Sequence, residues 1–448
     1  MTAKQAIEKG LALATCGLYA DAALAFCRAV ELDPRQAEAY QRLGEVLLPL
    51  GRWQDAADSF CRAVELRPVY PEAYNHLGVA LKNLERLPEA EECLRQAIAQ
   101  QGDYVAAHHN LGNCLKAAGR LSDAEAAYLR AIDLDPDLPE PRYSLATLYL
   151  IQGQFAKGWP LLEARFARQG GFRLPIAPWR GEDLAGRRIL LYYEQGFGDT
   201  FQFVRYAFEV ARLGATTTVW LQKPLARLFR DGQTAFAVCD DGRTLDPRQF
   251  DFACSLYSLP AIFTAKDAAI PAAVPYIESP AAAVAAWRQK IAGPAAGRLR
   301  VGVVWAGNPE HDDDANRSIP IECFSGLFAA PVFWVSLLAG PGRRPTRRRP
   351  LFDPSAGLTD FAETAGLIAS LDLVIAVDTA VAHLAGAMGK KTWILLPFRP
   401  DWRWGLTGDT SLWYPTARLF RQQALGDWPE VLQRVGAALA AELAGAGV

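Results

Sequence analysis

The feature that most restricts the fold is a repeat of 34 residues in the first part of the chain. Aligned on this period, the sequence gives five units, which begin at residues 3, 37, 71, 105 and 139. The eighth position of each unit is small, and it is occupied by Gly10, Gly44, Gly78, Gly112 and Ala146. The twenty-fourth position is large, and it is occupied by Phe26, Phe60, Leu94, Tyr128 and Leu162. A constant period of this length predicts a solenoid in which each unit is one supersecondary element stacked on its neighbours.

Each of these positions has a physical reason. Small residues at positions eight and twenty let the two helices of a unit approach closely, and the large residue at position twenty-four is expected to fill the space between units. The turn between the helices favours a left-handed backbone, and it carries Gly17, Gly51, Gly119 and Gly153. The pattern resembles the tetratricopeptide repeat, which implies a helical solenoid over residues 1–170 with a fading, capping fifth unit.

The concave surface of such a solenoid predicts a polypeptide or another macromolecule as partner or acceptor. An asparagine ladder at the sixth repeat position would hold a peptide backbone. That position instead reads Glu8, Arg42, His76, Asn110 and Ser144. The sequence therefore predicts a partner in the groove and leaves its kind open.

Composition narrows the class of protein. The 448 residues are 51% hydrophobic and 21% charged, so they can form a large core, and a net charge of −2 gives no reason to expect nucleic acid. No apolar run is long enough to span a bilayer, because Asp372 interrupts even LIASLDLVIAV, and the N-terminus lacks the apolar core of a signal peptide. Eight cysteines without a CxxC pair are typical of a reduced chain. We expect a cytoplasmic protein without a membrane span.

After Phe166 the helical period stops and apolar segments of strand length alternate with helical ones. The segments RRILLYY, TTTVWL, FAVC and FDFACSL lie in a first half, and RVGVVWAG, VFWVSLL, DLVIAV and KTWILL lie in a second. Continuous apolar strands separated by helices predict parallel sheets covered on both faces. We expect two Rossmann-like domains, over 186–285 and 298–448, joined near Pro280 to Gly297. Ligands of such sheets bind beyond the carboxyl ends of the strands.

The first strand end with polar residues reads EQGFGDT. It runs through Glu194, Gln195, Gly196, Phe197, Gly198, Asp199 and Thr200. The glycines permit a tight turn and close approach of backbone to a ligand, while Asp199 or Thr200 could cap the next helix. A plain strand–helix turn with a capping aspartate is an equally open interpretation.

Two further strand ends carry candidate ligand contacts. After RVGVV, the small residue Gly307 and its neighbour Asn308 leave space for a ligand, and Arg317 is either a phosphate partner or a solvated arginine. After DLVIAV, Asp378 or Thr379 caps a helix whose first amides form an anion site.

One turn into that helix stands His383. It faces the same side as Thr379 and is either a ligand contact or a buried, satisfied histidine. Nearby tryptophans, among them Trp402 and Trp404, are interpreted as packing.

At these motifs the chain resembles the glycosyltransferase family that includes the bacterial lipopolysaccharide heptosyltransferases, and in particular repeat-bearing proteins with that domain. The matching stretches are YYEQGFGDTFQFVRYA, VGVVWAGNPEHDDDANRSIP, TAGLIASLDLVIAVDTAVAHLAGAMGKKTWILLPFRPDWRW and SLWYPTARLFRQ. The resemblance implies a GT-B fold, with donor bound by the C-terminal half and acceptor by the N-terminal half. It also implies inverting, metal-independent transfer from a nucleotide-diphosphate sugar, which is a substrate, so no cofactor is expected.

The resemblance assigns roles at matching positions. Asp199 matches the carboxylate thought to act as general base, with Glu194, Gln195, Gly196 and Gly198 as its loop or acceptor contacts. Arg317, with Gly307 and Asn308, matches the donor side. Asp378, Thr379 and His383 match the motif that holds the diphosphate. Asp312, Asp313 and Asp314 imitate a metal-binding motif of another glycosyltransferase fold, and we interpret them as surface charge.

The chain departs from the family between Ser336 and Pro341, where relatives usually carry a Gln and a Lys. An arginine-rich stretch follows, with Arg343, Arg344, Arg347, Arg348 and Arg349. It is interpreted as a solvated loop or a contact to an anion, and its flanking prolines argue against a helix. The family resemblance implies that this stretch lies at the nucleoside end of the donor site.

Three hypotheses follow. The first is a glycosyltransferase whose repeats recruit the acceptor or a partner. The second is a non-catalytic scaffold with a degenerate glycosyltransferase domain, which the departure after Ser336 would favour. A nucleotide-sugar epimerase on the same fold is the third, and the repeats argue against it because they imply a macromolecular client.

Overall fold

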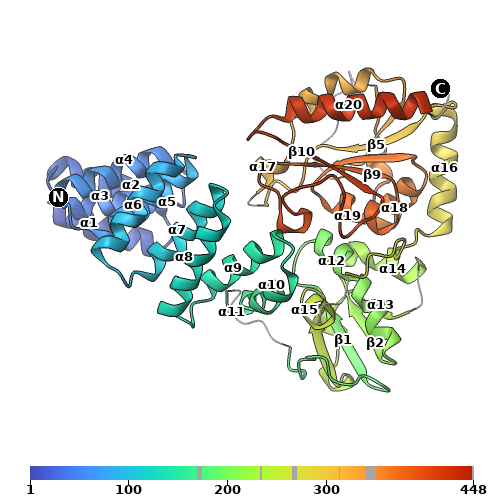
Figure 1. The fold of residues 1–448 in the computed structure, drawn as a ribbon, viewed down its shortest axis with the longest axis horizontal. Helices are drawn as coiled ribbons and strands as arrows, with labels where there is room; N and C mark the ends of the chain where they lie inside the picture. The colour runs from blue at the N-terminus through green and yellow to red at the C-terminus, as the bar shows by residue number, and fades with distance from the viewer. Residues whose placement is uncertain (169–173, 233–234, 265–269, 312, 340–349, 446–448) are drawn as a thin grey trace. The chain divides into compact units, whose positions relative to one another are not determined.

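A computed structural model describes residues 1–168, 174–232, 235–264, 270–311, 313–339 and 350–445 (Figure 1). The chain divides into two compact units. One unit comprises Met1–Tyr149 with Leu161–Gly171, and the other Leu150–Pro160 with Phe172–Val448. Among the helices of these described ranges, none is long and apolar enough to cross a membrane.

The first unit consists of stacked helix pairs (Figure 1). Its helices are α1 (Ala3–Thr15), α2 (Tyr19–Leu32), α3 (Ala37–Leu47), α4 (Trp53–Leu66), α5 (Pro71–Asn83), α6 (Leu87–Gln100), α7 (Val105–Ala117), α8 (Leu121–Leu134), α9 (Pro139–Ile151) and the short α11 (Arg165–Arg168). The first helix of every pair begins at the residue where the repeat period places the start of a unit. The predicted solenoid is confirmed.

The small residue at position eight is required because the large residue at position twenty-four lies against it. A Cβ atom on Gly44 would lie 2.5 Å from the Phe60 ring, and one on Gly112 would lie 2.5 Å from the Tyr128 ring. The large residue therefore fills the space between the two helices of its own unit. It also reaches the next unit, since the Phe60 ring centroid is 5.4 Å from that of His76. The sequence pattern predicted only the second of these contacts.

The turns between paired helices use a left-handed backbone, as expected. Gly17, Gly51 and Gly119 have φ of +75°, +69° and +76°. The third unit has Glu85 at this position, with φ of 61°. A side chain at such φ is strained relative to glycine, so this unit is the exception in the series.

A ladder of polar side chains joins the first helices of consecutive units. Each bond links position five of one unit to position six of the next, 35 residues on. The bonds are Gln41 Nε2 to His76 Nδ1 at 2.8 Å, Asn110 Nδ2 to Asn75 Oδ1 at 2.9 Å, and His109 Nε2 to Ser144 Oγ at 2.9 Å. The sixth repeat position thus carries no asparagine ladder but takes part in a mixed one. The sequence did not predict it, because position six alone does not reveal it.

The second unit begins with part of the fifth repeat. Its helix α10 (Phe155–Leu162) buries Trp159, whose ring centroid lies 5.3 Å from Trp402, 6.2 Å from Phe203 and 6.4 Å from Trp413. Residues 150–160 therefore share a core with the α/β region, although the period of the repeat runs through them.

The N-terminal lobe of this unit (residues 174–280) contains a parallel sheet of order β3-β2-β1-β4. Its strands are β1 (Arg188–Tyr192), β2 (Thr216–Trp220), β3 (Ala237–Cys239) and β4 (Phe252–Ser255), and its helices are α12 (Phe197–Phe203), α13 (Arg205–Arg212), α14 (Ala226–Gly232) and α15 (Leu259–Thr264). The predicted strands form. Pro178, which precedes these strands in the sequence, also joins the sheet through a parallel β-bridge to Ala253.

The C-terminal lobe (residues 281–445) contains a second parallel sheet, of order β10-β9-β8-β5-β6-β7. Its strands are β5 (Arg300–Val304), β6 (Phe333–Ser336), β7 (Leu351–Phe352), β8 (Leu373–Val377), β9 (Thr392–Leu396) and β10 (Ala417–Arg421), and its helices are α16 (Ala281–Ala295), α17 (Asp314–Arg317), α18 (Phe361–Ala369), α19 (Ala380–Ala387) and α20 (Trp428–Gly445). The two Rossmann-like lobes confirm the predicted fold class. Helix α16 occupies the segment that the sequence predicted to be a junction.

The chain order of the strands reverses at one point in each sheet. Strand β1 lies between β2 and β4, and β5 lies between β6 and β8. Crevices for ligands form at such switch points, outside the carboxyl ends of the strands. The three strand ends singled out from the sequence follow β1, β5 and β8.

Candidate functional site

One cavity of about 1070 Å³ lies within the second unit, and residues of both lobes line it. The sequence-predicted residues that line it are Gln195, Gly196, Gly198, Asp199, Gly307, Asn308, Arg317, Asp378, Thr379 and His383. Glu194, the first residue of the EQGFGDT strand end, is not among the residues that line the cavity. The fold thus brings three separate strand ends to one cavity.

The loop after β1 is fixed by hydrogen bonds at both ends. Gly196 is the N-cap of helix α12, and its N–H donates to Asp199 Oδ2 at 3.1 Å. Thr200 Oγ1 donates to Gln222 Oε1 at 2.9 Å, and Gln222 Nε2 donates to the Gln195 carbonyl at 2.9 Å. Asp199 is therefore not the N-cap residue that the sequence suggested, because Gly196 holds that place; Asp199 is the third residue of α12, its carboxylate accepts from the Gly196 N–H, and it also has a second partner.

Glycine at 198 is required by the approach of helix α19. A Cβ atom on Gly198 would lie 2.9 Å from His383 Cδ2 and 3.7 Å from the Ala380 Cα. The first turns of α12 and α19 therefore touch, which brings the loops after β1 and β8 into one site.

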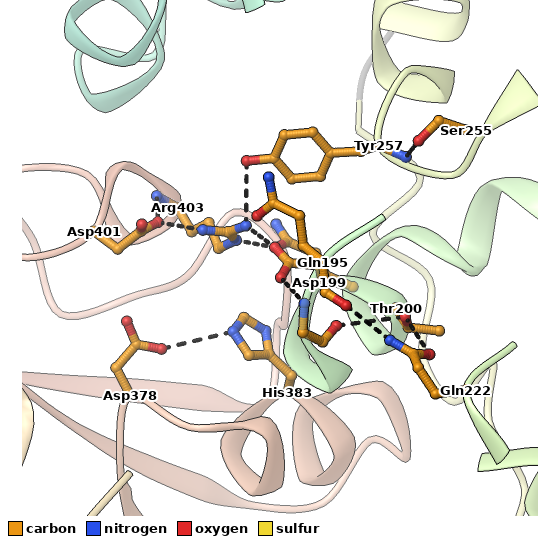
Figure 2. Close-up of polar contacts among 12 residues, drawn as sticks. Gln195, Asp199, Thr200, Gln222, Ser255, Tyr257, Asp378, His383, Asp401 and Arg403 are labelled. Carbon is orange, nitrogen blue, oxygen red and sulfur yellow. Dashed lines mark hydrogen bonds and ion pairs between the residues drawn. The ribbon is translucent and has the colours of Figure 1, made fainter. Parts of the chain in front are cut away.

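The second partner of Asp199 is Arg403, from the C-terminal lobe (Figure 2). Arg403 Nε donates to Gln202 Oε1 at 2.6 Å, Nη1 donates to Asp401 Oδ1 at 2.8 Å, and Nη2 donates to Tyr257 Oη at 3.4 Å. Burial alone would lower the pKa of Arg403, but the carboxylates of Asp401 and Asp199 raise it. The guanidinium therefore stays charged between the lobes.

Sequence reasoning missed Arg403. It stands in the 3₁₀ turn Trp402–Trp404 after strand β9, between tryptophans that are only 6% and 3% exposed. Their burial confirms the packing interpretation. A charged residue between two buried aromatic residues near a strand end was a usable signal, but nothing in the local sequence names a partner 204 residues away.

His383 lines the cavity but is only 5% exposed. Its Nε2 lies 3.6 Å from Asp378 Oδ1, its Nδ1 is 2.8 Å from Tyr414 Oη, and its ring stacks on Trp404 with centroids 5.2 Å apart. Burial alone would raise the pKa of Asp378, but hydrogen bonding and attraction from His383 hold it below its ordinary value. Asp378 and His383 therefore form a fixed part of the cavity lining, and Figure 2 shows the contact between them.

Two polar atoms at the wall are buried without a hydrogen-bond partner among the described residues. They are Thr379 Oγ1 and Arg317 Nε. Thr379 is the residue before helix α19 but makes no side-chain cap. Arg317 Nε lies 3.7 Å from Asp314 Oδ1, and the Arg317 side chain is 14% exposed. Both atoms could bond to a group in the cavity.

The loop after β5 is held by its own hydrogen bonds. Gly307 N–H donates to Ser318 Oγ at 2.9 Å, and Ser318 Oγ donates to Asp314 Oδ1 at 2.8 Å. Asn308 Oδ1 accepts from the Glu310 N–H at 3.2 Å. Asp314 is 16% exposed, so its interpretation as surface charge is wrong, because it orders this loop.

Other predictions for this region fall partly outside the described residues. These concern Asp312, the end of the Ser336 to Pro341 departure, and the arginine-rich stretch of Arg343, Arg344, Arg347, Arg348 and Arg349. Ser336 itself is buried, and Leu337 and Leu338 line the cavity. Within the ranges that the structure covers, no cluster of three His, Cys, Asp or Glu side chains could hold a metal ion.

Comparisons with known families match both parts of the chain. Tetratricopeptide repeat models match residues 7–71, 76–139 and 127–159. The model of glycosyltransferase family 9 (heptosyltransferase) matches residues 355–395. This segment contains the strand end from Asp378 to His383 and does not extend to Asp199 or Arg317.

Among individual proteins, the chain is similar to protein FlbA of Caulobacter vibrioides, with 25% identity over 334 residues, 68% of this chain and 55% of FlbA. The chain thus spans about half the length of this curated relative. The solved structure of MamA matches at 25% identity over 36% of this chain and 94% of MamA, with a TM-score of 0.33. A thermophilic tetratricopeptide-repeat protein of Thermus thermophilus matches at 26% identity over 38% of this chain and 98% of that protein, with a TM-score of 0.34.

The helix pairs follow the repeat period, and the family match covers one of the three strand ends at the cavity. The chain carries tetratricopeptide repeats within residues 7–159, and its C-terminal α/β region resembles glycosyltransferase family 9, the heptosyltransferases.

Proposed function

We propose that the protein is a glycosyltransferase that transfers a sugar from a nucleotide-diphosphate sugar to an acceptor hydroxyl, with inversion and without a metal ion. The observation that carries this proposal is the shared cavity, in which three strand ends meet between two Rossmann-like lobes. Cavities at switch points of such sheets are the usual place for nucleotide ligands.

The donor diphosphate would lie against the start of helix α19. The first amides of a helix attract anions, and the Thr379 hydroxyl and Arg317 Nε add donors that have no hydrogen-bond partner among the described residues. Gly307 and Asn308 line the same cavity, and the missing side chain of Gly307 leaves room for Arg317, whose Nε would lie 2.9 Å from a Cβ atom there. These groups would stabilise the charge that develops on the leaving diphosphate.

Asp199 is the better candidate for the general base. The ring nitrogens of His383 face Asp378 and Tyr414, and the residue is only 5% exposed. It therefore has no lone pair directed at the hydroxyl of an acceptor substrate. The Asp199 side chain is 19% exposed and lines the cavity. Its oxygens accept from Gly196 and Arg403, but a carboxylate has about four lone-pair sites, so acceptor capacity remains.

The proposed reaction has one displacement step. The acceptor oxygen forms a bond to the anomeric carbon while the bond from that carbon to the diphosphate oxygen breaks. The acceptor proton passes to Asp199, and the bonding electron pair leaves with the nucleoside diphosphate. Gln195 and Gly196, beside Asp199, would contact the acceptor.

The repeat unit would recruit the acceptor or a partner protein. Its polar ladder offers hydrogen-bonding groups along consecutive units, and tetratricopeptide repeats are peptide- and protein-binding modules. Binding measurements like those that identify the donor can also identify this client.

Donor hydrolysis tests the proposal without a known acceptor, because water can replace the hydroxyl. Release of nucleoside diphosphate from UDP-, GDP-, ADP- and dTDP-sugars should be measurable for one of them. Asp199→Asn should lower this rate by about 100-fold or more with little change in nucleoside diphosphate affinity. The control is Asp409→Asn, since Asp409 is 68% exposed and does not line the cavity.

Melting curves decide whether each variant is folded, because removing the Asp199 charge leaves Arg403 with Asp401 as its remaining carboxylate partner. A folded Asp199→Asn variant with unchanged turnover would refute the base role. If no donor is hydrolysed or bound, the non-catalytic scaffold is the function that remains. One observation favours that alternative: both carboxylate oxygens of Asp199 already accept hydrogen bonds from the protein.

A further inference from the structure

Arg403 links the two lobes through the residue proposed as the base. Asp199, Gln202 and Tyr257 belong to the N-terminal lobe, whereas Arg403 and Asp401 belong to the C-terminal lobe. The Arg403 side chain is 11% exposed and uses three of its nitrogens on these partners. Few of its five N–H groups remain for a ligand.

The turn that carries Arg403 is held rigidly. Asp401 accepts from the Arg403 backbone N–H at 3.0 Å and from its guanidinium at 2.8 Å. From strand β10, Arg421 donates to the backbone carbonyls of Trp404, Gly405 and Gly408. Asp401 thus holds the backbone and the guanidinium of Arg403, and Arg421 holds the turn that carries it. A side chain fixed in this way can define the position of its hydrogen-bond partner.

Asp199, the partner of Arg403, is also held on its other side. Asp199 Oδ2 accepts from the Gly196 N–H, while Oδ1 contacts Arg403, so the plane of the carboxylate is set by one group from each lobe. If Arg403 were absent, only the loop after β1 would hold the carboxylate. Misplacement of a catalytic group by about 1 Å can cost about 100-fold in rate.

We propose that Arg403 is a positioning residue, which aims the Asp199 carboxylate from the donor lobe and so makes the base competent only when the two lobes are joined. This inference rests on the proposed glycosyltransferase function. Arg403 acts through Asp199 and contributes little to donor affinity.

The test is a double-mutant cycle on donor hydrolysis, with the nucleotide sugar that the wild-type protein hydrolyses. Arg403→Met should lower kcat by about 100-fold while KM changes by less than about 3-fold, and Arg403→Lys should recover part of the loss. In the Asp199→Asn background, Arg403→Met should cause no further loss, because the group that it positions is already gone.

The matched control is Arg300→Met. Arg300 pairs with Asp372 at the opposite end of strands β5 and β8 from the cavity, so its loss should lower stability without changing kcat.

An unchanged kcat in folded Arg403→Met would overturn the inference. So would an equal loss in the wild-type and Asp199→Asn backgrounds, because Arg403 would then act on the donor directly. Absence of any hydrolysis or nucleotide binding by the wild-type protein is a different result, which removes the proposed function and this inference with it.

Discussion

Two residues that line the cavity, Thr379 and Arg317, each have a buried atom, Oγ1 and Nε, without a hydrogen-bond partner among the described residues. Buried polar groups in folded proteins are nearly always hydrogen-bonded, so an exception needs a reason. Both atoms lie on residues that line the same cavity, where a bound anion would satisfy them. His383, by contrast, has a partner on each ring nitrogen and serves to shape the wall.

Thr379→Val tests this interpretation. Valine keeps the shape and removes a hydroxyl that has no partner in the described protein, so the melting temperature without ligand should stay the same or rise. Affinity for the nucleoside diphosphate should fall by about tenfold, the loss of one hydrogen bond to a charged group. Calorimetric titration and thermal melts measure the two effects.

Thr416→Val provides the matched control. Thr416 Oγ1 is also buried without a partner among the described residues, but Thr416 does not line the cavity. Its substitution should leave affinity unchanged. Equal affinity for wild type and Thr379→Val would remove the hydroxyl from the donor site.

At the scale of elements, the solenoid was predictable because each helix pair is set by residues close in sequence. The glycine at position eight and the large residue at position twenty-four lie in one unit, as Gly44 and Phe60 show. The polar ladder was missed because each of its bonds joins two units.

Gly44→Ala should destabilise the solenoid by about 1–3 kcal/mol, because the added methyl group meets the Phe60 ring at 2.5 Å. Urea denaturation monitored by circular dichroism measures the change. Gly102→Ala is the control within the same solenoid, since a Cβ atom there has no heavy atom within 4 Å. Similar destabilisation by both substitutions would show that the close contact at Gly44 is not the cause.

The sheets were less fully predictable. The apolar strands β5, β8 and β9 are buried on both faces and stand out in the sequence. Strand β7 has only two residues, and strand β10 reads ARLFR, with an arginine at its exposed second position. Such an edge strand breaks the continuous apolar pattern, so it was not recognised.

For the second unit as a whole, three arginines among the described residues join the lobes. Arg205 donates to the Trp413 carbonyl at 3.0 Å, Arg227 donates to both oxygens of Asp360 at 2.7 Å, and Arg403 pairs with Asp199. Motifs at strand ends could be read locally, but these pairings depend on how two separate sheets come together. The cavity exists because of that assembly, and the sequence alone does not reveal it.

The central claim is that this cavity binds a nucleotide-diphosphate sugar. Its most direct test is calorimetric titration of the full chain with UDP, GDP, ADP, dTDP and CDP, with inorganic phosphate as the reference. We predict saturable binding of one nucleoside diphosphate at one site per chain, weakened by Thr379→Val and not by Thr416→Val. Absence of binding by all five nucleotides, or binding that is insensitive to Thr379→Val and Arg317→Ala, would contradict the claim.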